Sequence, residues 1–324
     1  MNEGSKELRE QMNVWLPYID DMLAGEGLIL SWRPFMAASI MVEDIIKIEG
    51  DSKDDFFMKT WFEPIYRTTF DWYKDRYGEA LASDSKPVGI GVFTAHGTPF
   101  EIRVPLKLLK TEKPGESVWV TLPNGVLPEE NVRDWVTTPP NWSSLSAEEL
   151  SEIDDQITSV GQRIRSIHMD LISVEFKDDK ARDLAETIEP HIYEGASKIA
   201  SRDYAELQLA FWEIHLATEK AMKLALMQQG LDAPRTHDLC DLRDLLASQG
   251  TILDQDTLKL LPSHEEVINL RYGTGQKNLS EAMTAYESML DIVSACTASM
   301  ERQLKYDNPS ALMRIPFWMK EDPS

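Results

Sequence analysis

The chain has 324 residues, of which 55 are acidic and 33 are basic, so its net charge is −22 at pH 7. This length is enough for two domains with well-buried cores. Because non-specific affinity for nucleic acid comes from Lys and Arg side chains that neutralise phosphates, the acidic balance argues against a surface that coats nucleic acid in bulk.

Cysteine usage and apolar runs indicate a compartment. Cys240 and Cys296 both fall in predicted helices, which suggests free thiols in a reducing compartment rather than a disulfide framework. Residues 1–11 lack the basic and apolar regions of a signal peptide, and the longest apolar run, residues 35–42, is too short to span a bilayer. We therefore expect a cytoplasmic protein without a membrane segment.

The first part of the chain is expected to contain long helices. Apolar residues recur with helical spacing from Lys6 to Ala24, and Pro17 is expected to kink this helix. Residues 28–48 fit strand and helix patterns alike, so both interpretations stay open. Residues 54–82 are rich in aromatic side chains and predict one helix or a broken pair.

A strand pattern follows these helices. Residues 88–104 predict two strands joined by a turn, and residues 117–122 alternate like a third strand. Gly89 and Gly91 lack the third glycine of a dinucleotide-binding fingerprint, so they indicate close packing of the backbone. The strands predict a mixed domain of unknown type over residues 1–145, with a small antiparallel sheet packed on helices.

A helical region is expected next. Residues 137–146 have the composition of a linker. Ser146 and Glu149 have the spacing of a capping box and predict a helix to about residue 176. A second helix, interrupted by a proline, is predicted over residues 179–200. We expect this helical region to extend over residues 146–306, followed by a tail over residues 307–324.

The longest helix is predicted over residues 203–229. The segment has no Gly or Pro before Gly230, and strong helix formers dominate it, so a helix of about 40 Å is expected at about 1.5 Å per residue. One face is apolar and carries Leu207, Ala210, Ile214, Ala221 and Ala225. The opposite face carries Glu206, Glu213 and Lys220 and is expected to meet solvent.

Three more helices are predicted beyond this one. Thr236 is the expected N-cap of the first, which places His237 in its first turn, where free N–H groups attract an anion. A capping box that begins at Ser263 starts the next helix. The last helix has apolar residues at steps of three and four over residues 282–304. Four helices with short connections predict an antiparallel bundle over about residues 200–306.

Three motifs in this region resemble the HEPN (higher eukaryotes and prokaryotes nucleotide-binding) domain. They are His-x3-Glu-Lys-x2-Lys at 215–223, Pro-Arg-Thr-His-Asp-Leu at 234–239 and Arg-Tyr-Gly at 271–273. The resemblance covers about a third of the chain. It implies a helical bundle, a function related to nucleotides and, as in many HEPN domains, pairing of two copies through helices.

The motif residues allow a functional and a structural interpretation. The candidate ligand-binding residues are Trp212, His215, Glu219, Lys223, Arg235, His237, Arg271 and Tyr272. On the functional interpretation, the cationic members converge on a phosphate, and an aromatic member stacks on a base. On the structural interpretation, the polar side chains of the long helix pair at i, i+4, and His237 locks the bundle.

Metal binding and catalysis are weighed separately. His215, Glu219 and His237 could share a metal, but the spacing is common and no Cys or second His lies on the same helix face, so no metal or cofactor is expected. HEPN ribonucleases carry an Arg-x4–6-His motif near the start of the last bundle helix, and Arg271 has no His within that reach.

The remaining catalytic candidates are Arg163 and His168, which match the Arg-x4-His spacing ahead of the bundle. Five positions apart on a helix, they point in rather different directions. We therefore expect a protein that binds a nucleotide or another phosphate-bearing ligand without catalysis. The alternatives are an RNase-like effector of a phage-defence or toxin–antitoxin system, and a module for dimerisation or partner docking.

Overall fold

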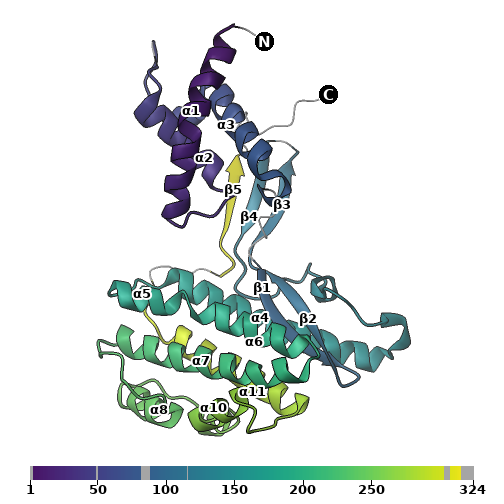
Figure 1. Ribbon diagram of the computed structural model, residues 1–324. Helices are drawn as coiled ribbons and strands as arrows, with labels where there is room; N and C mark the ends of the chain where they lie inside the picture. Colours follow the sequence, from purple (N-terminus) through teal and green to yellow (C-terminus); the bar gives the residue numbers. More distant parts are fainter. Residues whose placement is uncertain (1–2, 49, 82–87, 115, 303–306, 315–324) are drawn as a thin grey trace. The chain divides into compact units, whose positions relative to one another are not determined.

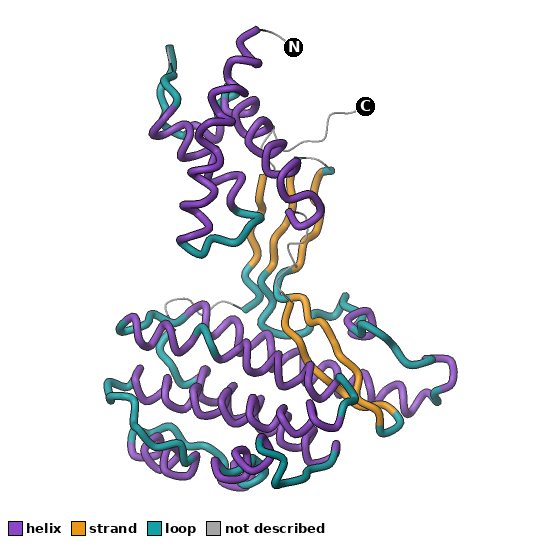
Figure 2. Tube along the Cα trace, viewed as in Figure 1, coloured by secondary structure: helices purple, strands orange, loops and turns teal. Residues whose placement is uncertain are grey.

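The structure, a computed structural model, describes residues 3–48, 50–81, 88–114, 116–302 and 307–314. These residues are mostly helical with two small antiparallel sheets (Figures 1 and 2), which confirms the predicted α+β class. The chain divides into two compact units. Unit 1 holds residues 1–86, 110–119 and 312–324, and unit 2 holds residues 87–109 and 120–311.

The regular structure of unit 1 outside its strands is helical. Its helical segments are α1 (Glu3–Gly25), α2 (Arg33–Ile40), a π-helical turn (Met41–Ile45), two 3-10 turns (Phe56–Met58 and Gly78–Leu81) and α3 (Phe62–Tyr77). Residues 28–48 are thus helical where they are regular. The predicted helix or broken pair over residues 54–82 is one α-helix, α3, flanked by two short 3-10 turns within the described residues. Pro17 lies inside α1 without ending it.

Aromatic side chains contribute to the core of unit 1. Phe62 is fully buried, and its ring packs edge-on against Phe35 and Phe56 at centroid distances of 6.3 and 5.0 Å. Asp20 lies in the same unit and is 1% exposed. Its carboxylate accepts hydrogen bonds from Arg33 and Tyr77, which compensate the loss of water around a buried charge.

Strands β1 (Val88–Ala95) and β2 (Thr98–Pro105) form the predicted hairpin in unit 2. The hairpin packs against α4 (Ala147–Ser173) and α6 (Ile188–Ala200). A Cβ atom on Gly89 would lie 2.3 Å from Ile164 Cγ2, and one on Gly91 would lie 2.7 Å from Val160 Cγ1. The two glycines therefore allow α4 to approach the strand closely, as their pattern predicted.

The third predicted strand, β4 (Ser117–Thr121), does not pair with this hairpin. It lies between β3 (Leu108–Lys113) and β5 (Ser310–Arg314) in a separate sheet of order β3-β4-β5. The hydroxyls of Thr121 and Ser310 are 2.6 Å apart although 189 residues separate them in the chain. The prediction of one sheet was wrong because strand alternation does not reveal so distant a partner.

Unit 2 begins at Pro87, because the hairpin packs on helices that follow it in the chain. The sequence prediction instead grouped the hairpin with residues 1–145 and began the helical region at 146. Part of the predicted tail forms β5. Residues 315–324 and the predicted apolar position Leu304 lie outside the described residues.

Local signals set several helix ends in unit 2. Capping boxes precede α4, at Ser146 with Glu149; α10 (His264–Arg271), at Ser263 with Glu266; and α11 (Leu279–Ala298), at Asn278 with Glu281. The first two were predicted. The break between α5 (Asp179–Ala185) and α6 precedes Pro190, which lies in the first turn of α6, where its missing N–H costs no helical hydrogen bond.

The start of α8 (Leu239–Ser248) differs from the prediction. Asp238, not Thr236, is the N-cap, and its carboxylate accepts hydrogen bonds from the N–H groups of Cys240 and Asp241. The Thr236 hydroxyl instead accepts from the N–H of Asp238. His237 therefore precedes the helix rather than occupying its first turn. A short helix that was not predicted, α9 (Gln255–Leu258), follows α8.

The long helix α7 (Tyr204–Gln228) packs against α5, α6, α8, α10 and α11 (Figure 1). Ala210, Ile214 and Ala221 of its apolar face are fully buried, as predicted. The expectation that Glu213 and Lys220 face solvent was wrong, because polar side chains of α6 pair with them. A polar helix face can be covered when its neighbour supplies hydrogen-bond partners.

Candidate ligand-binding site

Four candidate side chains lie along one side of α7. Trp212, His215, Glu219 and Lys223 follow one another at steps of three, four and four residues, which places them on neighbouring turns. This side of α7 meets α10 and the segment that precedes α8. The sequence spacing that suggested the site is therefore also what aligns its side chains.

The Glu219 carboxylate is the centre of the cluster and is only 5% exposed. Its Oε1 accepts from Lys223 Nζ at 2.8 Å and from His237 Nδ1 at 3.0 Å. Burial by itself raises the pKa of Glu219, but the hydrogen bonds from Lys223 and His237 outweigh this and hold the pKa below its ordinary value. Glu219 is thus a charged carboxylate at neutral pH, with one cation committed to it.

His215 is fully buried beside this carboxylate. Its Nδ1 lies 3.1 Å from the carbonyl oxygen of Pro262, so Nδ1 carries a proton and donates it. Its Nε2 lies 3.6 Å from Glu219 Oε2. Burial lowers the pKa of His215, which makes the imidazole neutral at pH 7 and its Nε2 unprotonated. His215 therefore fixes the segment before α10 instead of facing a ligand.

His237 reaches the cluster from the segment before α8. Its Nδ1 donates to Glu219, and the side chain remains 54% exposed. The ring of His264 stacks on it at a centroid distance of 4.8 Å and an angle of 15°. His264 was not among the predicted site residues. No local signal identifies it, because its ring meets that of His237 only when α10 and the segment before α8 both pack against α7.

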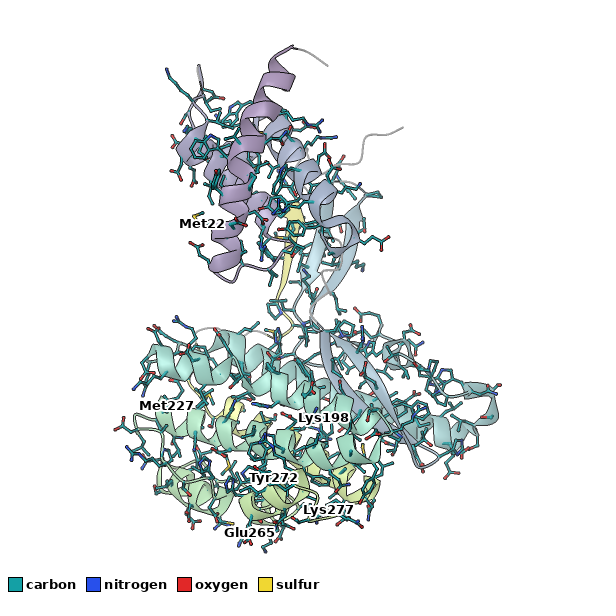
Figure 3. The ribbon with its side chains drawn as sticks, viewed as in Figure 1. Met22, Lys198, Met227, Glu265, Tyr272 and Lys277 are labelled. Carbon is teal, nitrogen blue, oxygen red and sulfur yellow. The ribbon has the colours of Figure 1, made fainter. Side chains whose placement is uncertain are left out.

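Arg271 and Trp212 form a second part of the site. The guanidinium of Arg271 lies 4.7 Å from the centre of the Trp212 ring, a cation–π contact, and Arg271 is exposed. Tyr272, labelled in Figure 3, is 77% exposed at the end of α10. Arg235 is also exposed and has no hydrogen-bond or ion-pair partner among the described residues.

The structure brings the predicted residues together to different degrees. His215, Glu219, Lys223 and His237 form one hydrogen-bonded cluster, and Trp212 stacks with Arg271. The face of Trp212 that Arg271 covers is not open to a base. In the described ranges, no group of three or more His, Cys, Asp or Glu side chains is arranged to hold a metal ion.

Arg163 and His168 are held apart by different partners. Arg163 donates to Asp291 Oδ1 at 2.9 Å and to the carbonyl oxygen of Glu287, both on α11. His168 Nδ1 lies 3.0 Å from Glu189 Oε1 on α6. The two side chains of the Arg-x4-His motif thus bind separate helices, and the structure does not join them in one site.

A buried residue near this motif was missed by the sequence interpretation. Arg165 is fully buried on α4 and makes two hydrogen bonds to the Glu130 carboxylate, at 2.6 and 2.7 Å. It also donates to the carbonyl oxygens of Pro105 and Gly125. Its contacts tie α4 to the loop that follows β4, which is a structural role.

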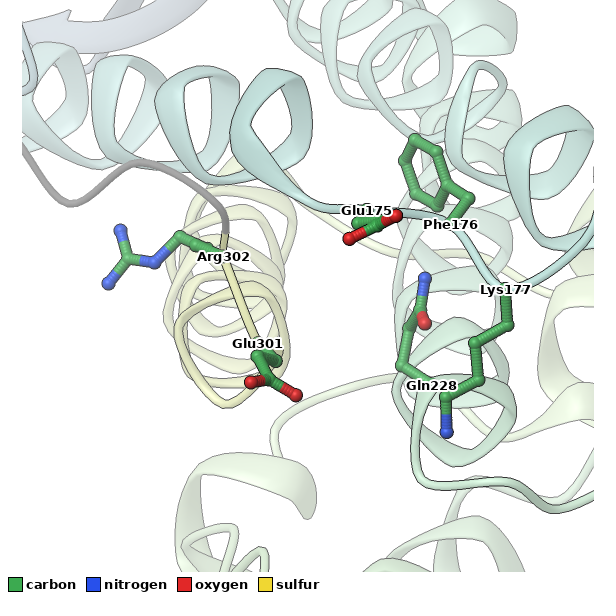
Figure 4. Close-up of a pocket in the computed structure, with 6 residues that line it drawn as sticks. All are labelled: Glu175, Phe176, Lys177, Gln228, Glu301 and Arg302. Atoms are coloured by element: carbon green, nitrogen blue, oxygen red, sulfur yellow. The ribbon is translucent and has the colours of Figure 1, made fainter.

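Cavities lie elsewhere in unit 2, and two of them are lined by more than one cationic side chain. The larger, of about 370 Å³, is lined by Glu175, Phe176, Lys177, Gln228, Glu301 and Arg302. In Figure 4 the Arg302 guanidinium points away from the other lining residues, so the cations do not converge. The second, of about 290 Å³, includes Lys259 and Lys277, which already pair with Asp256 and Glu281 at 2.9 and 3.1 Å.

The fold and site define a mostly helical α+β protein with a polar cluster between α7, α10 and the segment before α8. Among the described residues, no helix combines the length and apolar character needed to cross a membrane. No family model, curated protein or solved structure matches the chain significantly. The function is therefore argued from the site itself.

Proposed function

We propose that unit 2 binds a nucleotide or a similar phosphate-bearing ligand, without cleaving it, on the face formed by α7, α10 and the segment before α8. The observation that carries the proposal is that the exposed His237 contacts a carboxylate already paired with Lys223, while Arg235 and Arg271 are exposed on the segments that contribute to the same face. Glu219 is paired with Lys223, so its charge does not repel an anion as strongly as a free carboxylate would.

Three side chains are available to such a ligand. His237 donates its Nδ1 proton to Glu219, which leaves Nε2 on the exposed side of the ring. Arg235 has a guanidinium without a described partner, and Arg271 has one that is exposed on the Trp212 ring. Guanidinium groups bind phosphate oxygens in pairs, which favours a phosphate over a single carboxylate oxygen.

The resemblance to the HEPN family supports the same proposal, since its three motifs supply these residues. Free cysteines, one exposed and one buried, support a reducing, cytoplasmic compartment.

Pairing of two copies through bundle helices remains part of the proposal, and sedimentation at several protein concentrations tests it. A strictly monomeric protein would remove that part without affecting ligand binding.

Thermal unfolding in low salt with mononucleotides and short RNAs tests the proposal. A ligand at 100 times its Kd adds about 2.7 kcal/mol to the unfolding free energy of the protein. We expect this gain with at least one nucleotide in the wild type, and its loss in Arg271→Ala and His237→Ala.

Arg182→Ala is the matched control, because Arg182 is an exposed arginine on α5 whose only ion-pair partner among the described residues is Asp179, one turn away. It should keep the full thermal shift. The absence of any shift with all nucleotides, or a shift that survives in Arg271→Ala, would contradict the proposed site. A large loss of stability in His237→Ala without ligand would favour the interpretation of His237 as a bundle lock.

RNA cleavage is the enzymatic alternative. In the part of the chain that the structure describes, Arg163 and His168 bind different helices, so this pair does not favour cleavage. We expect RNA incubated with the wild type to stay intact. Degradation that disappears in His168→Ala would overturn this expectation and make unit 2 a nuclease.

A further inference from the structure

A second polar cluster lies between α6 and α7, outside the proposed ligand site. Lys220 Nζ lies 2.7 Å from His191 Nε2 and 3.0 Å from the Thr187 hydroxyl oxygen. His191 Nδ1 lies 2.7 Å from Glu213 Oε2. Three functional groups thus follow one another in a chain, carboxylate, imidazole and amine, across two helices that lie side by side (Figure 1).

The hydrogen-bond directions in this chain are set by chemistry. The Glu213 carboxylate can only accept, so His191 Nδ1 carries the proton and donates it. In a neutral imidazole Nε2 then has a lone pair, which accepts from Lys220. His191 is therefore placed to take a proton from the amine, and the Glu213 carboxylate stabilises the imidazolium that results.

Lys220 differs from other partly buried lysines of unit 2 in its partner. Lys223 and Lys198 bind carboxylates directly, at 2.8 and 2.6 Å. Lys220 makes no ion pair with a carboxylate among the described residues, because the His191 ring stands between it and Glu213. Burial lowers the pKa of Lys220, although Glu219 and Glu213 act in the opposite direction.

We propose that Lys220 is a nucleophilic amine that forms a covalent imine with a small aldehyde, with His191 as its acid–base partner and Glu213 as the residue that positions His191. The geometry is that of an activated nucleophile, in which the nucleophile hydrogen-bonds to a base and a third group orients the base. The side chains of His191 and Glu213 are 20% and 16% exposed, so the cluster reaches the surface.

The reaction balances without a further reactant. The Lys220 ammonium gives one proton to His191, and the amine lone pair attacks the carbonyl carbon and forms the C–N bond. The carbonyl oxygen takes up the electron pair, then one proton from His191 and one from the attacking nitrogen, and leaves as water. The products are a protonated imine on Lys220, which keeps the third proton of the ammonium, and one water molecule.

The first test compares lysines within the unmodified protein. The full chain is incubated with benzaldehyde, a neutral probe that the net charge of the protein does not repel, and imines are reduced with cyanoborohydride. Peptide mass spectrometry then follows modification at each lysine. We expect Lys220 to react at least about tenfold faster than Lys223, which is bound to a carboxylate, and than the exposed Lys180. A rate at Lys220 equal to or below theirs overturns the proposal.

Variants test the role of each partner. His191→Gln should slow modification of Lys220 by about 100-fold, because Gln cannot relay the proton, and leave the rates at Lys223 and Lys180 unchanged. Glu213→Gln should slow modification of Lys220 less than His191→Gln does. Glu213→Asp keeps the carboxylate, so Lys220 should react faster in this variant than in Glu213→Gln. Unchanged modification of Lys220 in a His191→Gln protein with wild-type circular dichroism would overturn the role of His191. The comparison within the wild type stands even where a variant does not fold.

Discussion

Glu219 connects three side chains of the candidate site, and its charge is compensated mainly by Lys223, which is itself 12% exposed. Removing one partner of a buried ion pair leaves the other charge without compensation. We expect Glu219→Ala to lower the unfolding free energy by about 3 kcal/mol, measured by chemical denaturation.

The matched control is the ion pair of Asp256 with Lys259, whose side chains are 88% and 62% exposed. Asp256→Ala should change the unfolding free energy by no more than about 0.5 kcal/mol, because water screens an exposed pair. Equal costs for the two substitutions would show that Glu219 is not held in a buried pair.

His215 should make stability depend on pH. In the unfolded chain its pKa is near the ordinary 6.5, and in the folded protein burial lowers the pKa. The unfolded state then binds more protons than the folded state as the pH falls through this range, so the unfolding free energy decreases on acidification. His215→Asn keeps an N–H donor for the Pro262 carbonyl but cannot titrate.

We therefore expect the wild type to lose more stability than His215→Asn between about pH 7.5 and pH 5.5, the range in which histidine titrates. The other histidines are the same in both proteins, so the difference in slope isolates His215. Parallel curves, measured by denaturation at each pH, would contradict a buried neutral His215.

At the scale of elements, some glycines allow a helix to approach a large side chain closely. A Cβ atom on Gly161 of α4 would lie 2.4 Å from Cζ3 of Trp135. We expect Gly161→Ala to destabilise the protein by about 2 kcal/mol, because the Trp135 ring must shift within a packed core. Thermal unfolding measures the effect.

Gly125→Ala is the control, since no heavy atom lies within 4 Å of a Cβ placed there. Its melting temperature should stay near that of the wild type. A smaller cost for Gly161→Ala than for Gly125→Ala would mean that α4 is free to move away from Trp135.

Some helix starts can be predicted from the few residues around them. The capping boxes of α4 and α10 were recognised from four residues each, because a cap depends only on its own turn. The start of α8 was placed at Thr236 instead of Asp238 because both residue types cap helices and only the backbone conformation distinguishes them.

At the scale of the whole molecule, the two units have separate hydrophobic cores. Phe62 belongs to the core of unit 1 and Ile157 to that of unit 2, and both are fully buried. Truncating either side chain removes packing inside one core, at a cost of about 3 kcal/mol. We expect Phe62→Ala to accelerate hydrogen exchange in the peptides of unit 1 and Ile157→Ala to do so in those of unit 2.

Hydrogen exchange followed by mass spectrometry distinguishes independent unfolding of the two units from joint unfolding, because every peptide reports on its own unit. Exchange that rises equally in both units after Phe62→Ala would show that they unfold as one cooperative body.

The sequence by itself determined the helical class, the hairpin, the extent of α7 and the line of side chains from Trp212 to Lys223. Each depends on composition, on a local cap or on the helical repeat, which act within a few turns. Only the tertiary structure decided that β4 pairs with β5, that His264 stacks on His237, and that Glu213 and Lys220 face α6. The helical repeat sets the angle between side chains on one helix, but the partner that each face meets depends on segments far away in the chain.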